Sequence, residues 1–207
     1  MFPVDEFIRG FYEVFPDQQH LSPWEITRIL PSIIEKMIST LGEDFTIADG
    51  IAIHKSSTIE HGAVLKPPLI VSENCFVAAT SYLRGGIYLG NSAIVGPGCE
   101  VKTSILFHHS VAAHLNFIGD SIVGSEVNFE AGSITANHYN EREWRPIPVL
   151  YKNELIQTDS TRFGSLIGDH SRIGANAVLS PGCLLLPNTI IKRLSLLDPV
   201  SEFNGMK

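Results

Sequence analysis

The sequence has few cysteines and no long apolar run. Its 207 residues include 3 cysteines, Cys75, Cys99 and Cys183, at wide spacing and without a CxxC pair. This pattern excludes a disulfide framework and a zinc knuckle. No apolar run reaches the roughly 18 residues of a membrane span, and the acidic opening MFPVDEFIRG does not fit a signal peptide. We expect a soluble, cytoplasmic protein in a reducing compartment.

Positive charge is also scarce. The chain has 15 Lys and Arg against 22 Asp and Glu, for a formal net charge of -7. It therefore lacks the broad basic surface that nucleic acid or an anionic membrane would require. A hydrophobic fraction of 44% and a charged fraction of 18% indicate a globular chain with a core. The length suits one large domain with a small appendage.

A six-residue period begins after residue 44. The hydrophobic residues on one phase are Ile47, Ile53, Ile59, Leu65, Val71, Val77, Leu83, Leu89, Val95, Val101 and Phe107. At the observed hydrophobic content, such a series arises by chance about once in ten thousand cases. Small side chains recur four residues after many of these positions, and the three cysteines lie at such positions. We therefore expect the cysteines to serve packing rather than redox or metal chemistry.

The period predicts an all-β fold, a left-handed parallel β-helix of hexapeptide repeats. The chain would turn a corner after each short strand, so that three hexads close one triangular coil of roughly 18 residues. The hexads slip near residues 105–111 and resume. The later hydrophobic positions are Val111, Phe117, Val123, Phe129, Ile167, Ile173, Leu179, Leu185 and Ile191.

Two segments lack the period. In residues 1–42, Ser22 and Glu25 form a capping box before an apolar stripe that ends at Gly42, which predicts a helix. We expect this segment to cover an open end of the prism or to pack on a neighbouring subunit. Residues 138–163 are charged and contain two prolines, which predicts a long inserted loop. The expected organisation is a helical segment 1–42, a β-helix 43–191 with the insert 138–163, and a C-terminal tail 192–207.

Two cations are predicted to stack on successive coils. Arg84 and Lys102 each follow a core aliphatic residue and lie one coil apart. Like charges at this spacing repel by roughly 1–4 kcal/mol unless an anion lies beside them. A bound phosphate would be such an anion. The alternative is a solvated charged face, with Glu60 or Glu100 as the partner.

Three further polar residues carry chemistry. His114 lies twelve residues after Lys102, and Asn128 and Asn137 follow it. Histidine is the commonest general base in proteins, and an asparagine amide can bind a sugar hydroxyl or an acyl oxygen.

The run AHLNFIGDSIVGSEVNFEAGSITAN closely resembles the acetyltransferase domain of the bifunctional N-acetylglucosamine-1-phosphate uridylyltransferases and their archaeal sugar-1-phosphate nucleotidylyltransferase relatives. The resemblance covers about residues 45–191. It implies that His114 is the general base and that Asn137 steadies the acyl oxygen. The residues it implies for sugar phosphate binding are Arg84, Lys102, Glu100, Phe117 and Asn128. Main-chain groups near Ala131 and Ala175 would face the pantetheine of acetyl-CoA.

The reaction implied by the resemblance moves an acetyl group from acetyl-CoA to the amine of a hexosamine 1-phosphate, without a metal. Members of the family are trimers with each site between subunits, so a homotrimer is implied. Nothing in the sequence resembles the nucleotidylyltransferase domain. No uridylyl transfer is therefore expected from this chain, and a separate nucleotidylyltransferase is a candidate partner.

Two alternatives come from other classes. A zinc site like that of the γ-class carbonic anhydrases would use His109 and His114, but residues 72–78, where a third ligand should lie, contain no histidine. A non-catalytic trimeric scaffold or sugar-phosphate-binding module is the stronger alternative. Phe117, where the family has a tyrosine, favours it, whereas the retention of His114, Arg84 and Lys102 disfavours it.

Overall fold

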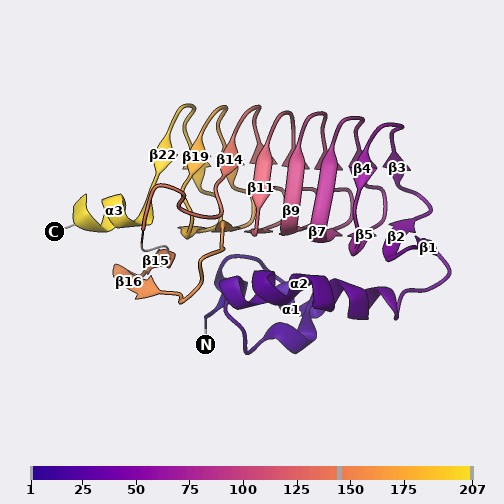
Figure 1. The fold of residues 1–207 in the computed structure, drawn as a ribbon, viewed down its shortest axis with the longest axis horizontal. Helices are drawn as coiled ribbons and strands as arrows, with labels where there is room; N and C mark the ends of the chain where they lie inside the picture. The colour runs from indigo at the N-terminus through magenta and orange to yellow at the C-terminus, as the bar shows by residue number, and fades with distance from the viewer. Residues whose placement is uncertain (1, 144–145, 206–207) are drawn as a thin grey trace.

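The computed structural model describes residues 2–143 and 146–205. Its centre is a left-handed parallel β-helix whose coils stack along one axis (Figure 1). Face I contains β4 (Val64–Leu65), the first part of β7 (Tyr82–Leu89), the first part of β9 (Glu100–Leu106), β11 (Phe117–Gly119), β14 (Ile134–Thr135), β19 (Val178–Leu179) and β22 (Leu196–Leu197).

Faces II and III complete the prism. Face II contains β2 (Ile51–His54), β5 (Leu69–Val71), the second parts of β7 and β9, β12 (Ile122–Val123), β17 (Ser165–Ile167) and β20 (Cys183–Leu185). Face III contains β3 (Thr58–Ile59), β6 (Phe76–Val77), β8 (Ile94–Val95), β10 (Val111–Ala112), β13 (Asn128–Phe129), β18 (Arg172–Ile173) and β21 (Ile190–Ile191). At the first edge, β1 (Phe45–Ala48) pairs antiparallel with β2.

Most of the periodic aliphatic residues form the core inside the prism. Ile47 is an exception, because it lies on β1 and is 45% exposed. Phe107 is a second exception and packs in the cluster outside the prism, while Leu106 points inside. The core inside the prism therefore begins after Ile47. At residues 106 and 107, the residue that points inward comes one position before the predicted one.

The predicted phase is also wrong by one residue at two later positions. Ala112 and Ile118 belong to the inner core, whereas Val111 and Phe117 are half-buried on the outside. The strand register explains the shift, because Leu83 pairs with Val101 but Val101 pairs with Ile118. This coil is one residue shorter than the one before it.

The N-terminal helices cover the side of the prism. They are η1 (Val4–Glu6), α1 (Phe11–Val14), η2 (Pro16–Gln18) and α2 (Pro23–Ile38), and α2 runs along the prism (Figure 1). The outward residues of face II are apolar and buried beneath this layer: Ala52, Ile70, Tyr88, Ile105, Ile122 and Leu166. The expectation that the segment covers an open end is therefore wrong. An apolar outer face must be removed from water, and face II is the one that these helices cover.

A glycine allows α2 to contact the prism closely. Gly86 has a φ of 90°, and a Cβ atom there would lie 2.8 Å from the backbone nitrogen of Pro31. Any larger residue would push the helix away from the corner between faces I and II.

The insert leaves the prism after β14 and returns at β17. It holds an antiparallel hairpin of β15 (Pro148–Tyr151) and β16 (Glu154–Gln157). The two ends of the insert meet where Phe163 N donates to Asn137 O at 3.1 Å. The coils continue past Ile191, the expected limit, to β22, and α3 (Pro199–Gly205) follows. Within residues 2–143 and 146–205, no helix has both the length and the apolar character of a membrane span.

Candidate functional site

The two stacked cations lie side by side on face I, since Arg84 and Lys102 are paired in register. Arg84 donates to Oε1 of Glu100 from Nε at 2.9 Å and from Nη2 at 2.6 Å. Lys102 Nζ donates to Oδ2 of Asp120 at 2.8 Å. A carboxylate of the chain itself therefore compensates each cation, and Glu100 is confirmed as a partner of Arg84.

Asp120 extends this pair into a buried network. Asn137 Nδ2 also donates to Asp120 Oδ2, and Nδ1 of His138 lies 3.1 Å from Oδ1 of Asn137. The Asp120 and Asn137 residues are 6% and 3% exposed. Asp120 thus fixes the positions of Lys102 and Asn137 together. We did not predict this residue, although it lies in the run that resembles the acetyltransferase domain, six residues after His114.

Phe117 lies against the same network. It pairs with Glu100 in register, and its ring folds over Gly119. A Cβ atom on Gly119 would meet Phe117 Cζ at 2.7 Å and Asn137 Nδ2 at 2.8 Å. The residues gathered here, called the face I cluster below, are Arg84, Glu100, Lys102, Phe117, Asp120 and Asn137.

His114 lies on the corner between faces III and I. Its carbonyl oxygen accepts from Gly132 N at 3.0 Å, that of Ala131 accepts from Asn176 N at 3.0 Å, and that of Ala175 accepts from Leu194 N at 3.0 Å. These bonds stack the corners of successive coils. His114, Ala131, Ala175 and Arg193 form one column, called the His114 corner below. The structure therefore brings together the predicted base and the two positions predicted to face acetyl-CoA.

The His114 corner lies where the face I strands begin, on the side of Glu100 and Phe117, whereas Lys102, Asp120 and Asn137 lie where these strands end. Gly119, the register partner of Lys102, ends β11, and His114 comes before that strand. Four residues lie between His114 and Gly119, so the exposed imidazole comes before the strand whose last residue is in register with Lys102.

Asn128 lies apart from the face I cluster as well. It is exposed on face III, between Val111 and Arg172 in register. His109 lies on the corner between faces II and III, where its N–H donates to Asn91 O at 2.9 Å. His109 and His114 are therefore on different corners. Among residues 2–143 and 146–205, no group of three or more His, Cys, Asp or Glu side chains could hold a metal ion.

A cavity of about 270 Å³ adjoins the His114 corner on face III, and its lining includes Asn128, Arg172, Lys192 and Arg193. Glu130 orders its edge by accepting from Ala175 N at 2.9 Å and from Arg193 Nε at 2.9 Å. The hydrogen bond from Arg193 lowers the pKa of the Glu130 carboxyl. Sequence analysis missed this set of cations, although Ile173 and Ile191 lie one coil apart in the period and thereby place Arg172 and Arg193 on neighbouring coils.

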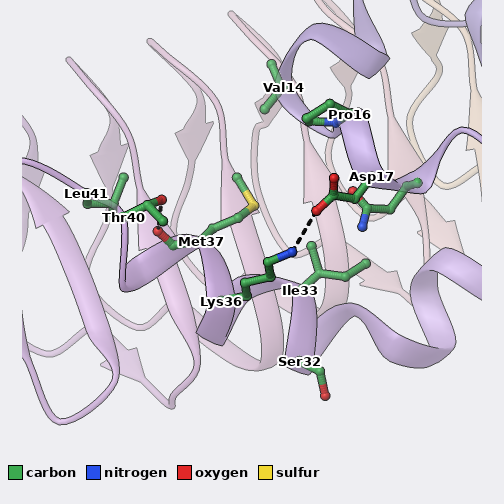
Figure 2. A pocket seen from close by; sticks show the side chains of 10 residues that line it. Val14, Pro16, Asp17, Ser32, Ile33, Lys36, Met37, Thr40 and Leu41 are labelled. Atoms are coloured by element: carbon green, nitrogen blue, oxygen red, sulfur yellow. Dashed lines mark hydrogen bonds and ion pairs between the residues drawn. The ribbon is translucent and has the colours of Figure 1, made fainter.

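A second hollow of about 390 Å³ lies in the helical layer. An ion pair of 2.7 Å between Lys36 Nζ and Asp17 Oδ2 crosses it, and Met37 and Ile33 form part of its apolar lining (Figure 2). None of the predicted site residues lines this hollow.

Comparison with known proteins gives no matching family model. The chain is 29% identical over 180 residues to the bifunctional protein GlmU of Methanococcus vannielii, covering 85% of this chain and 43% of that protein. It is 28% identical over 166 residues to the bifunctional sugar-1-phosphate nucleotidylyltransferase/acetyltransferase of Sulfurisphaera tokodaii, covering 77% and 41%. It is 34% identical over 154 residues to the bifunctional protein GlmU of Baumannia cicadellinicola subsp. Homalodisca coagulata, covering 72% and 32%.

The matched region spans less than half the length of these relatives. The Methanococcus match extends over 85% of this chain, which is enough to include the face I cluster in the middle of the sequence. This chain is a homologue of part of the bifunctional GlmU-type sugar-1-phosphate nucleotidylyltransferase/acetyltransferases.

Proposed function

We propose that the protein is an N-acetyltransferase that passes an acetyl group from acetyl-CoA to the amine of a hexosamine 1-phosphate. The observation that supports this most is the Lys102–Asp120–Asn137 network, in which a cation and an amide are held in fixed positions on rigid strands. Packing of the prism requires neither side chain. A preorganised polar network of this kind is what an acyl-transfer site needs.

The acceptor would bind at the face I cluster. Arg84 and Lys102 would bind its phosphate through charge-assisted hydrogen bonds. Glu100 and Asp120 already hold these cations in position, so little side-chain entropy is lost on binding. The Phe117 ring would pack against the sugar.

The donor would bind along the His114 corner. The main chain at Ala131 and Ala175 would face the pantetheine. The cavity beside them carries Arg172, Lys192 and Arg193, which are suited to the phosphates of coenzyme A.

In the reaction, His114 would take a proton from the substrate ammonium group, and the free amine would attack the thioester carbonyl. Formation of the C–N bond gives a tetrahedral intermediate, in which the Asn137 amide would steady the oxygen that becomes negative. The C–S bond breaks when this intermediate collapses. The nitrogen then loses its second proton, so that one of the two protons leaves with the thiol of coenzyme A and the other passes to solvent.

In one chain, His114 precedes the face I strands and the Lys102–Asp120–Asn137 network lies where they end, and a second copy would bring a His114 to that network. We therefore propose a homotrimer in which His114 and Asn128 of one copy meet the face I cluster of the next. Light scattering should give three times the mass of 22.7 kDa. Mixed trimers of His114→Ala and Asn137→Ala chains, each inactive alone, should regain part of the activity, whereas sites confined to single chains would leave the mixture inactive.

The test of the activity is thiol release from acetyl-CoA with a panel of amino sugar phosphates. His114→Ala should abolish turnover and leave assembly unchanged. Arg84→Ala should mainly raise KM for the sugar phosphate, because a charge-assisted contact is lost. Equal activity of wild type and His114→Ala would exclude the proposed base.

One observation favours a non-catalytic binding module instead. Both face I cations already have carboxylate partners within the chain, so their stacking does not demand a bound phosphate. Such a module would bind hexosamine 1-phosphate in calorimetry and release no thiol from acetyl-CoA.

A further inference from the structure

A polar groove of about 450 Å³ lies beside the face I cluster, outside the residues assigned so far. Its walls come from α2, from the corner between faces I and II, and from the returning end of the insert. The groove is lined by Thr27, Arg28, Pro31, Thr103, Asp120, Asp159, Ser160, Thr161 and Arg162. Its size falls within the range of about 300–1,000 Å³ that is typical of small-molecule sites.

The groove is continuous with the face I cluster through the chain. Thr103 and Asp120 directly follow Lys102 and its register partner Gly119. Asp120 lines the groove and also holds the Lys102 ammonium group at 2.8 Å. A ligand at Lys102 therefore has the groove on one side.

Helix α2 is fixed at this point. Its Pro31 meets the prism at Gly86, two residues after Arg84. Arg28 lies three positions before Pro31, on the same side of the helix. The close helix–corner contact thus fixes the backbone of α2 at the groove, and Arg28 lines that groove together with Thr103 and Asp120.

The loop that carries Arg162 is also fixed. Gly164 N donates to Asp120 O at 2.9 Å, and Phe163 N donates to Asn137 O at 3.1 Å. Ser160 Oγ donates to Arg162 O at 2.8 Å. The insert therefore returns directly against the two buried members of the network.

The cations in this region differ in whether they have an ion-pair partner. Arg84 and Lys102 are paired with carboxylates, whereas neither Arg28 nor Arg162 forms an ion pair with any residue that the structure describes. Both are exposed. The groove thus holds two guanidinium groups without an ion-pair partner, beside the exposed carboxylate of Asp159 and the Asp120 carboxylate that is already paired with Lys102. Two guanidinium groups and the Lys102 ammonium group suit a phosphate.

We propose that this groove is part of the acceptor site and that Arg28 and Arg162 bind the phosphate of the acceptor together with Lys102. This inference rests on the proposed function. It makes α2 and the insert, which lie outside the hexapeptide coils, determinants of specificity for a phosphorylated amino sugar over the unphosphorylated one.

The test compares Arg28→Ala and Arg162→Ala with a matched control, Lys36→Ala. Lys36 is an exposed cation on the same helix and lines the separate hollow of Figure 2. Calorimetric titration with glucosamine 1-phosphate should show binding weakened about 10- to 100-fold in the two arginine variants. Lys36→Ala should bind as the wild type does. KM for the phosphorylated acceptor should rise in parallel, and kcat/KM for glucosamine should be unchanged.

The inference is overturned if the arginine variants match Lys36→Ala, or if they lose glucosamine and glucosamine 1-phosphate equally. It also fails if the wild-type protein does not bind glucosamine 1-phosphate. Absence of thiol release with every acceptor would remove the proposed activity alone, because the titrations still decide whether Arg28 and Arg162 bind the phosphorylated sugar.

Discussion

At the scale of single residues, the cysteines show what burial does to a reactive group. Cys75, Cys99 and Cys183 are 2%, 1% and 4% exposed. Burial raises the pKa of the Cys75 thiol to about 11 and raises that of Cys99 as well. A thiol reagent reacts with thiolate, which is scarce at neutral pH when the pKa is raised.

We therefore expect the native protein to be almost unreactive toward an aromatic disulfide reagent at pH 7.5. In denaturant, all three thiols should react within minutes. The measurement is the absorbance of the released chromophore, and the same reagent can follow thiol release from acetyl-CoA. A thiol that reacts rapidly in the native state would show that the coils open readily.

The residues of the candidate site differ in how far sequence could place them. The spacing of Arg84 and Lys102 predicted their stacking, because the hexads define successive coils. Asp120 was missed, because its role depends on a corner that brings it to Lys102 and Asn137 at once. Asn128 shares the repeat but faces a different side of the prism. A linear period assigns each residue to a coil, and the one-residue shortening after Val101 places Ile118 rather than Phe117 in the core.

At the scale of elements, the start of α2 is fixed by its capping box. The Ser22 N–H donates to Glu25 Oε2 at 2.8 Å. Hydrogen bonds from the Ser22 side chain and backbone lower the pKa of the Glu25 carboxyl below its ordinary value of 4.5. A lowered folded-state pKa means that this stabilisation is complete above about pH 4.5. It is lost as the pH falls through the folded-state pKa.

Glu25→Ala should therefore lower the free energy of unfolding by about 0.5–1 kcal/mol at pH 7. The difference from the wild type should shrink as the pH falls below about 4.5, because the carboxylate is lost as the pH falls through its folded-state pKa. Urea titrations of both proteins over a series of pH values from 7 downward give this difference. A difference that stays constant with pH would exclude the carboxylate as its source.

The sequence predicted the helix α2 but not the surface on which it packs. The capping box and the apolar stripe predicted a helix after Ser22, and the structure has one over Pro23–Ile38. Its partner surface could not be read from the helix alone. The relevant signal was on the strands, where face II carries apolar residues such as Ile70 and Ile105 at outward positions.

At the scale of the whole molecule, the helical layer couples coils that would otherwise contact only their neighbours. Phe11 is fully buried, and its ring stacks at 5.0 Å on Phe15 and at 5.9 Å on Phe107. The same layer contacts β5, β7 and β9. Loss of packing at one point in the layer is therefore felt by several coils.

Phe11→Ala should cost about 3–5 kcal/mol and preserve a single unfolding transition. Phe45→Ala, at the half-buried antiparallel edge, should cost less. Urea unfolding followed by far-UV circular dichroism and by intrinsic fluorescence distinguishes these cases. Two separate transitions in Phe11→Ala would show that the coils unfold independently of the helical layer.

The hydrogen-bonded base of the insert makes ligand preference independent of the stacking of the coils. Because Asn137 and Phe163 are tied to each other, the length and content of what lies between them add little to the entropy of closing that loop. Residues near Arg162 could be exchanged for a different segment while the stacked coils keep their register. Ligand preference could then be redesigned by replacing the inserted segment alone, while the β-helix that supports it stays unchanged.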